Sequence, residues 1–281
     1  MASLVGAFAA THGPLIARDW DKLPEPQRTR MAAAFDEVGR RLHACRPDIL
    51  VLVSPDHWVN FFINNLPAVL IGIGEEHDGP PEPFMKNVYP HQTLTGHPRF
   101  GRHLLNTAIA NDFEPALSYR LKLDHGACIP LWRMGIGPEL PIVPILINDL
   151  EEPMPSIRRC LSWGRLLRQA IESYPEPSRI AVLATGGLSH SIGEATMGWV
   201  DEPFDRECIR HFEVGEELAL SKFLERELPK TGNGAHEIRD WVVAHGAAGS
   251  QGFELIDYFP SPETLVGAAF ASWRMDEGRI N

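Results

Sequence analysis

The sequence predicts an α/β fold, a single-domain sandwich in which a central, mostly buried mixed sheet is flanked by helices. Five short runs rich in Val, Ile and Leu are apolar at consecutive positions, as strands covered on both faces are. Segments with helical spacing lie between the runs, and such alternation is typical of α/β proteins. No repeat, low-complexity tract or linker divides the chain, so we expect one domain over residues 1–281.

The apolar runs define the expected strands. They are Leu4–Ala10, Ile49–Val53, Ala68–Ile73, Ile142–Ile147 and Ile180–Ala184. Two intervening segments carry an apolar stripe at the spacing of one helix face. The first stripe is Met31, Phe35, Val38 and Leu42, and the second is Trp163, Leu166, Leu167, Ala170, Ile171 and Tyr174.

Three further segments have a distinct character. His77–Pro98 is rich in Pro, Gly and His and has little periodicity, so we expect a long loop that serves as a lid or an interface arm. An acidic stretch after Gly193 leads into an expected helix near Glu207–Glu225. A last helix is expected over Glu237–Ala248, where one stripe contains Glu237, Trp241, Ala244 and Ala248.

The composition argues against several classes of function. Of the 281 residues, 44% are hydrophobic and 22% are charged, which is ordinary for a soluble globular protein. A net charge of -11 argues against nonspecific nucleic-acid binding and against adhesion to an acidic membrane. No run approaches the roughly 18 to 20 apolar residues that span a bilayer.

The predicted compartment is the cytoplasm. The four cysteines are scattered and form no C-x-x-C pair, which favours reduced thiols over a disulfide framework. The apolar start of the chain lacks the basic segment of a signal peptide, and its apolar run before His12 is too short for one. A buried first strand fits this segment better.

Two histidines directly follow predicted strands. His12 comes after Leu4–Ala10, and His57 comes after Ile49–Val53 with Asp56 beside it. Ligands of open α/β sheets bind at strand ends, and ligating imidazoles are commonly oriented by a nearby carboxylate. A lone histidine after a strand is usually a hydrogen-bonded loop residue, but two at neighbouring strand ends favour a shared site.

Glu237 shares its predicted helix stripe with Trp241, which indicates that the carboxylate is at least partly buried. A buried lone carboxylate is costly unless a cation or a metal accompanies it. The alternative is a salt bridge, for instance with Arg239. Two neutral imidazoles and one carboxylate can bind a divalent metal on one face and leave the other face open to substrate.

Two more histidines are candidates for moving protons. His190 follows Ile180–Ala184 through a glycine pair, which lets backbone approach closely and leaves space for a ligand. His125 directly follows Asp124, another carboxylate–imidazole neighbour pair. Either could act as a general acid or base, although a structural role is the default for any single histidine. The chain has no Walker loop, dinucleotide-binding glycine motif or G-x-S-x-G elbow.

These contexts, taken together and in order, resemble the class III extradiol ring-cleaving dioxygenases. The similarity runs from the Val5–His12 segment to the Tyr258–Phe270 segment, and so covers most of the chain. The motifs that carry it are Pro55-Asp56-His57, Asp124-His125-Gly126 with Pro130-Leu131, Thr185-Gly186-Gly187-Leu188-Ser189-His190, Trp163-Gly164-Arg165, and His236-Glu237-Ile238 with Trp241.

The resemblance implies a role for each candidate. His12, His57 and Glu237 would be the Fe(II) ligands, His190 would be the base that takes a proton from a catechol, and His125 would be a later proton donor. The implied substrates are a small aromatic compound and O2, and the implied product is a ring-opened muconic semialdehyde. Both atoms of O2 would enter the product, so no external reductant is needed.

The resemblance also bears on specificity and assembly. Our alignment puts Pro262 and Glu263 where relatives that act on ring-carboxylated substrates have a polar pair. An acidic residue there would repel a substrate carboxylate, so we expect a catechol without one, or one recognised elsewhere. The chain lacks the small helical partner subunit of the protocatechuate enzyme. We therefore expect a homo-oligomer, a site closed by His77–Pro98 or by a second copy, or a separate small helical partner.

Two alternatives stay open at this point. One keeps the fold and opens the ring of an aminophenol or a dihydroxyphenylalanine-like compound with zinc or iron. The other is a non-enzymatic interaction protein with the same fold. The presence of all five candidate side chains favours an enzyme over this second alternative.

Overall fold

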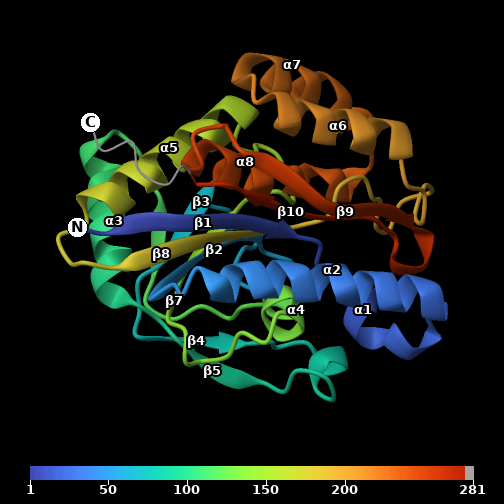
Figure 1. Cartoon of the computed structure of the whole chain (residues 1–281), viewed down its shortest axis with the longest axis horizontal. Helices are drawn as coiled ribbons and strands as arrows, with labels where there is room; N and C mark the ends of the chain where they lie inside the picture. The colour runs from blue at the N-terminus through green and yellow to red at the C-terminus, as the bar shows by residue number, and fades with distance from the viewer. Residues whose placement is uncertain (276–281) are drawn as a thin grey trace.

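The computed structural model describes residues 1–275 and contains one eight-stranded mixed sheet with helices on both faces (Figure 1). This arrangement confirms the predicted fold class. The strand order is β6-β3-β7-β2-β8-β1-β10-β9. The strands are β1 (Ser3–Ala10), β2 (Ile49–Pro55), β3 (Val69–Gly72), β6 (Ala116–Ser118), β7 (Ile142–Ile147), β8 (Arg179–Thr185), β9 (Phe253–Ser261) and β10 (Val266–Trp273).

The four central strands β7, β2, β8 and β1 are parallel, so their carboxyl ends meet at one edge of the sheet. Both faces of these strands are buried, which explains why their sequences are apolar at consecutive positions. In β2, Ile49, Val51 and Val53 pack on one face, while Leu50 and Leu52 pack on the other. All five predicted strands are present; Ile142–Ile147 has the predicted bounds, and the ends of the others differ by at most two residues.

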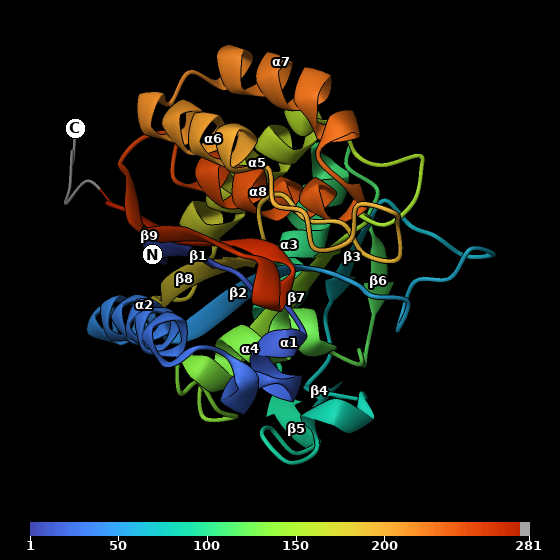
Figure 2. The same cartoon turned by 90° about the vertical axis from the view of Figure 1, so that its right-hand side faces the viewer.

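The helices form a layer on each side of the sheet, as Figure 2 shows. One layer packs α3, α5, α6, α7 and α8 against the sheet, and the other packs α1, α2 and α4. Their bounds are α1 (Leu15–Arg18), α2 (Glu25–Ala44), α3 (Pro98–Ala110), α4 (His125–Arg133), α5 (Ile157–Ser173), α6 (Glu202–Val214), α7 (Glu217–Glu227) and α8 (Ile238–Ala247). None of the described helices is both long and apolar enough to cross a membrane.

Three predicted segments differ from the structure. His77–Pro98 is not a plain loop, because β4 (Glu76–Gly79) and β5 (Gln92–Thr95) pair in it as an antiparallel hairpin. The helix expected near Glu207–Glu225 is two helices, since Gly215 ends α6 with a left-handed backbone (φ 74°). The helix expected from Glu237 begins at Ile238, and a short 3-10 helix, Asn233–Glu237, leads into it.

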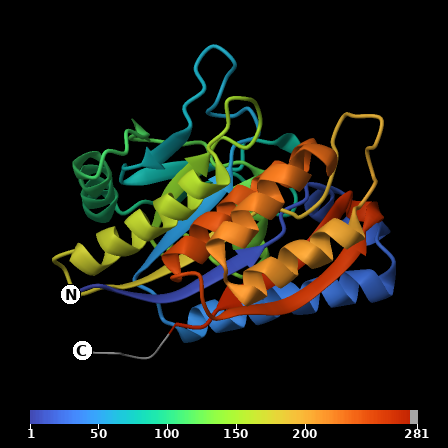
Figure 3. The same cartoon turned by 90° about the horizontal axis from the view of Figure 1, so that it is seen from above.

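The edge formed by β9 and β10 was not among the predicted strands. β10 pairs antiparallel with β1, and β9 pairs antiparallel with β10, which extends the sheet beyond the parallel strands. Figure 3, the view from above, shows these C-terminal strands beside the N-terminal strand. The turn between them brings Thr264, Leu265 and Val266 to the same edge at which the parallel strands end.

Candidate metal centre and cavity

The side chains predicted to form a site come together at the carboxyl ends of the parallel strands. His12 lies just after β1, His57 just after β2, and His190 in the loop that follows β8. Glu237 reaches the same place from the other direction, at the start of α8. His12, His190 and Glu237 are buried, while the His57 side chain is 24% exposed and so keeps access to the opening.

Glu237 is the centre of this arrangement. Its Oε1 lies 3.4 Å from Nε2 of His12, 3.4 Å from Nε2 of His57 and 3.5 Å from Nε2 of His190. Its Oε2 accepts a hydrogen bond from the backbone N–H of Gly187 at 3.0 Å. Gly186 next to it has φ +115°, and a Cβ there would lie 3.0 Å from the Cβ of Glu237. The glycine pair thus lets the β8 loop approach the carboxylate closely.

The geometry does not support the salt bridge between Glu237 and Arg239 that the sequence left open. Arg239, the alternative partner, donates instead to the carbonyl of Pro155 and to His236. Donor atoms that bind one ion at about 2.0 to 2.2 Å lie roughly 3 to 3.5 Å from one another, as the Glu237 oxygen and the imidazole nitrogens do. Burial alone would raise the pKa of Glu237, but the imidazoles of His12 and His190 hold that pKa well below its usual value. The carboxylate is therefore an anion in a buried site.

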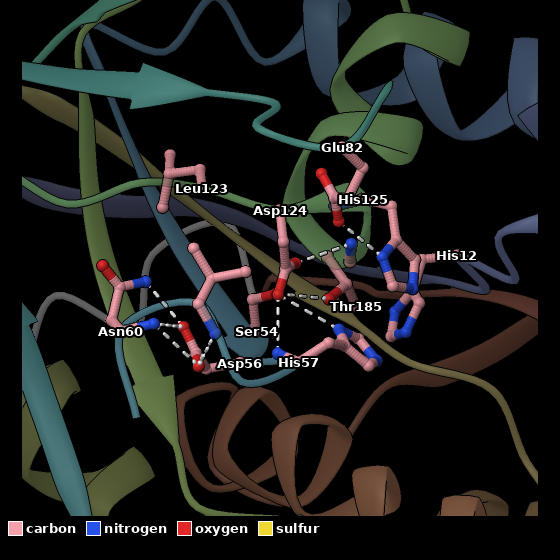
Figure 4. Close-up of polar contacts among 12 residues, drawn as sticks. His12, Ser54, Asp56, His57, Asn60, Glu82, Leu123, Asp124, His125 and Thr185 are labelled. Atoms are coloured by element: carbon pink, nitrogen blue, oxygen red, sulfur yellow. Dashed lines mark hydrogen bonds and ion pairs between the residues drawn. The ribbon is translucent and has the colours of Figure 1, made fainter. Parts of the chain in front are cut away.

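The carboxylate that orients His57 is Asp124, not the neighbouring Asp56 (Figure 4). Asp124 Oδ2 accepts from the backbone N–H of His57 at 2.6 Å and lies 3.1 Å from its Nδ1. Asp56 accepts instead from the backbone N–H groups of residues 59–61, where it fixes the turn after β2. Burial lowers the pKa of His57, but Asp124 and Glu237 outweigh it and raise that pKa well above its ordinary value. With Nδ1 on Asp124, the Nε2 of His57 is free to face Glu237.

His125 is likewise held by a carboxylate that is distant in sequence. Glu82, on the segment between β4 and β5, accepts from the His125 backbone N–H at 2.9 Å and lies 2.8 Å from its Nδ1. Asp124, the expected partner of His125, instead caps α4 through the N–H of Gly126. Burial and the nearby His57 lower the pKa of His125. Figure 4 shows Glu82 and His125 on one side of the cluster and Asp124 and His57 on the other.

His190 is fixed by its own backbone. Its Nδ1 lies 3.0 Å from the carbonyl oxygen of Leu188, so that nitrogen carries a proton, and Nε2 faces Glu237. A Cβ at Gly234 would lie 2.0 Å from Nε2 of His190, so only glycine leaves room for the ring. Burial would lower the pKa of His190, but the Glu237 carboxylate raises it above the ordinary value. Nothing in the sequence around Gly234 indicated this role.

A second set of donor atoms overlaps the first. The donor atoms of His12, His57 and His125 lie within 4.8 Å of one another, so His125 is near enough to be a third imidazole ligand. Glu82, Asp124 and His125 form another such group. Asp124, however, already uses both oxygens to accept backbone N–H groups. We interpret this last group as hydrogen-bonded support for the imidazoles.

The cluster opens into a cavity of about 380 Å³. Its walls come from the strand ends, the β8 loop, the 3-10 helix before α8 and the turn between β9 and β10. The lining residues are His12, Gly13, Pro14, His57, Trp58, His125, Asp149, Leu150, Gly187, His190, Ile192, Asn233, Gly234, Glu237, Thr264, Leu265 and Val266. Two of them, Trp58 and Leu265, have left-handed backbones (φ 59° and 64°), a strain of about 1–3 kcal/mol that clusters at functional sites.

Two expectations about the cavity were wrong. No residue of His77–Pro98 is among its described lining, so this segment supports His125 through Glu82 rather than covering the opening. Glu263 does not face the cavity either; it is exposed and accepts from Gln27 at 3.0 Å, while its neighbour Thr264 lines the wall. The argument from Glu263 about a substrate carboxylate therefore loses its basis.

Comparison with known proteins adds an independent line of information. A family model described as the catalytic LigB subunit of aromatic ring-opening dioxygenase matches residues 6–268. A 2,3-dihydroxyphenylpropionate/2,3-dihydroxicinnamic acid 1,2-dioxygenase of Paraburkholderia phymatum is 25% identical over 87% of this chain and 90% of its own length. A gallate dioxygenase of Pseudomonas putida is 31% identical over 54% of this chain and 45% of its own length.

The fold also has a counterpart among solved structures. The crystal structure of an uncharacterized protein from Escherichia coli K12 superimposes with a TM-score of 0.61 and covers 96% of this chain and 100% of that chain. The sequence identity is 16%, so this likeness concerns the fold alone.

Proposed function

This chain belongs to the family of the catalytic LigB subunit of aromatic ring-opening dioxygenases and is a ring-cleaving dioxygenase; we propose that it uses Fe(II) to open a catechol ring beside the two hydroxyl groups. The product would be a muconic semialdehyde that contains both atoms of O2. The observation that carries the proposal is the convergence of three imidazole Nε2 atoms on one buried Glu237 oxygen.

His12, His57 and Glu237 are the residues that would hold the metal. Two imidazoles and one carboxylate are the ligand set of non-haem Fe(II) oxygenases, which leaves adjacent positions for substrate and O2. When bound, the ion would supply a path for electrons between catechol and O2 and make the catechol hydroxyl easier to deprotonate. Asp124 supports this set, because it holds His57 with Nε2 turned toward Glu237.

His190 would accept the first proton. Its Nδ1–H is held by the Leu188 carbonyl, so the lone pair of Nε2 faces the cavity. The nearby Glu237 carboxylate raises the pKa of His190 against the effect of burial, which strengthens the ring as a base. A catechol hydroxyl placed beside Glu237 would lie within reach of this nitrogen.

His125 would deliver a proton later in the reaction. Glu82 holds its Nδ1 at 2.8 Å, and the ring lines the cavity beside His57, with 4.1 Å between ring centroids. A carboxylate behind an imidazole fixes its tautomer and stabilises the protonated ring, as in other acid–base pairs. His190 and His125 thus form two proton-handling groups at one cavity.

The test is a panel of catechols, gallate, protocatechuate and aminophenols, followed under air for the yellow ring-opened chromophore. Protein purified without oxygen would be loaded with Fe(II) or with Zn(II). We expect colour with at least one catechol and Fe(II), and none with Zn(II). If no compound gave colour with either metal, the proposed reaction would be wrong.

A zinc-dependent alternative has one observation in its favour. His12, His57 and His125 could supply three imidazoles, a ligand set typical of catalytic zinc. Metal content separates the two ligand sets. Zinc retained in Glu237→Ala but lost in His125→Ala would favour the three-histidine set and the aminophenol or dihydroxyphenylalanine-like chemistry that we expected as an alternative.

A further inference from the structure

The wall of the cavity is mostly apolar, and its ionisable groups outside the imidazoles are carboxyl groups. Among its described lining residues there is neither Lys nor Arg. The apolar part of the wall is Gly13, Pro14, Trp58, Leu150, Gly187, Ile192, Gly234, Leu265 and Val266, and the four imidazoles belong to the centre described above. The two ionisable groups that remain are carboxyl groups, Glu237 and Asp149.

The neutral polar groups of the wall are already hydrogen-bonded within the protein. The Asn233 side chain accepts from the N–H of Ile192 and donates to its carbonyl oxygen, both at 2.9 Å. The Thr264 hydroxyl lies 2.5 Å from the hydroxyl of Ser261 and within 3.3 Å of the Ser261 carbonyl oxygen. Both side chains therefore already have hydrogen-bond partners within the protein.

The buried cation Arg239 does not line the cavity. Arg239 is 7% exposed and is not among the lining residues. Its guanidinium hydrogen-bonds the Pro155 carbonyl oxygen and His236. A carboxylate on the substrate would thus leave water for a wall whose described residues include two carboxyl groups and no Lys or Arg. Burying a charge without a partner is strongly unfavourable, whereas burying alkyl carbon there is favourable.

We propose that the cavity selects catechols whose ring substituent is uncharged and apolar, with the substituent packed against Trp58, Leu150, Ile192 and Leu265. This inference rests on the proposed ring opening and names its substrate class. The carboxylate-free substrate expected from Glu263 is thus reached again, but from the composition of the wall. Trp58 and Ile192 are 43% and 44% exposed, so they form the rim over which such a substituent enters.

The test uses substrates matched in shape that differ in charge. In the first pair, 3-propylcatechol is compared with 3-(2,3-dihydroxyphenyl)propionate, and in the second, 4-ethylcatechol with 3,4-dihydroxyphenylacetate. With Fe(II)-loaded protein under air, we expect kcat/KM at least about tenfold higher for the alkyl member of at least one pair, because the carboxylate member buries an unpaired charge. Equal or higher kcat/KM for both carboxylates would overturn the proposal.

A binding measurement keeps this inference separate from the proposed reaction. Without oxygen the ring cannot be opened, so equilibrium dialysis of the metal-loaded protein gives Kd for each compound of a pair. Tighter binding of the alkyl compound supports the inference even if no catechol is cleaved in air. That absence of cleavage would contradict only the proposed ring opening. Tighter binding of the carboxylates overturns the inference even if both compounds are cleaved.

A cation placed on the rim should weaken the preference for the alkyl compound over the carboxylate. Ile192→Lys puts an ammonium group at the opening and leaves the backbone N–H and carbonyl of that residue free to bond Asn233 as before. We expect the ratio of alkyl to carboxylate kcat/KM to fall by about tenfold or more, the effect of one charge-assisted contact. Ile192→Met, of similar size and uncharged, is the matched control and should keep the wild-type ratio. An unchanged ratio in the lysine variant, with Kd values also unchanged, would count against a cavity that lacks only a cation.

Discussion

Glu237 and Asp240 lie one turn apart at the start of α8, and both carboxyl groups are buried, yet their surroundings are opposite. Glu237 faces imidazole nitrogens and a backbone N–H, so its pKa is lowered. Asp240 faces the carboxyl group of Asp149, and among the described residues the two carboxyl groups have only each other as hydrogen-bond partners. Burial, and then the charge of Asp149, raise the pKa of Asp240 well above its ordinary value.

The difference teaches that neither residue type nor burial decides the charge of a buried carboxyl group; its neighbours do. Glu237 is an anion prepared for a cation, whereas Asp149 and Asp240 are two acids that cannot both ionise side by side. We propose a metal centre only for the first arrangement.

The largest contrast is between Glu237→Gln and Asp240→Asn, which remove the same charge one turn apart. We expect Glu237→Gln to weaken metal binding by more than about 100-fold and to abolish ring opening, since changes outside the ligand set typically cost only about 10- to 100-fold. Asp240→Asn should bind metal as the wild type does. Metal titration of both variants decides the matter, and equal affinities would remove Glu237 from the proposed ligand set.

His190→Phe asks whether the third imidazole at Glu237 handles protons rather than metal. We expect kcat to fall by about 10²- to 10⁴-fold, the usual contribution of a general base, with metal content unchanged. Phe keeps the ring's bulk against Gly234 but has no nitrogen. A fully active His190→Phe protein would refute the assignment, and a metal-free one would make His190 a ligand instead.

The next prediction compares two aspartates at His57. Asp124→Asn changes the group that holds the His57 ring, and we expect metal affinity to drop by about 10- to 100-fold. Asp56→Asn changes the adjacent carboxylate, which bonds only the following turn, and should affect the stability of that turn more than metal affinity. If Asp56→Asn weakened metal binding as much as Asp124→Asn, the structural distinction between them would be wrong.

Glu82 allows the same kind of comparison on the hairpin. Glu82→Gln keeps the size of the side chain but removes the charge behind His125, so we expect kcat to fall about tenfold with KM nearly unchanged. Asp78→Asn is the control, because Asp78 anchors the same hairpin through Arg120 at 2.7 Å without contacting His125. Equal losses of kcat in both variants would indicate a loosened hairpin rather than a positioned imidazole.

The smallest effect concerns stability and pH. When the pKa of a carboxyl group is higher in the folded protein than in the unfolded chain, the protein is most stable below the unfolded pKa of about 3.9. Its stability then falls as the pH rises toward the folded pKa. The free energy of unfolding of Asp240→Asn should therefore rise relative to that of the wild type above about pH 4, by up to roughly 1.4 kcal/mol per pH unit. Urea unfolding at pH 5 and pH 8 measures this gain. If the variant were less stable than the wild type at pH 8, Asp240 would be ionised in the folded protein.

The parts of the fold that sequence could predict are those whose pattern is local. β2 and β7 are apolar on both faces, and their buried runs stand out from the helical segments around them. β9 is only partly buried, with Glu254 and Asp257 among its residues, so it gave no such run. The hairpin strands β4 and β5 are short and polar, and Gly215 divides a continuous helical pattern in two.

For the site, the sequence indicated the five proposed functional residues but not the partners that hold them. His12 and His57 were marked by their place after strands, and Glu237 by its place on an apolar stripe. Which carboxylate meets which imidazole depends on contacts between distant segments. Glu82 lies between prolines and carries no local signal of its bond to His125. Asp124, by contrast, directly precedes a helix, and its capping role could have been predicted.

The proposed ligands lie far apart along the chain: His12 follows the first described strand, and Glu237 precedes the last described α-helix. On the ribosome, the imidazole of His12 emerges long before the carboxylate that it must meet has been made. A nascent chain therefore has no finished binding place, and the ion must be delivered to a polypeptide that has already closed its sheet. Once delivered, an ion at 100 times its Kd would add about 2.7 kcal/mol against unfolding. If the proposed site holds its ion, metal supply would determine how long each copy survives, as well as whether it works.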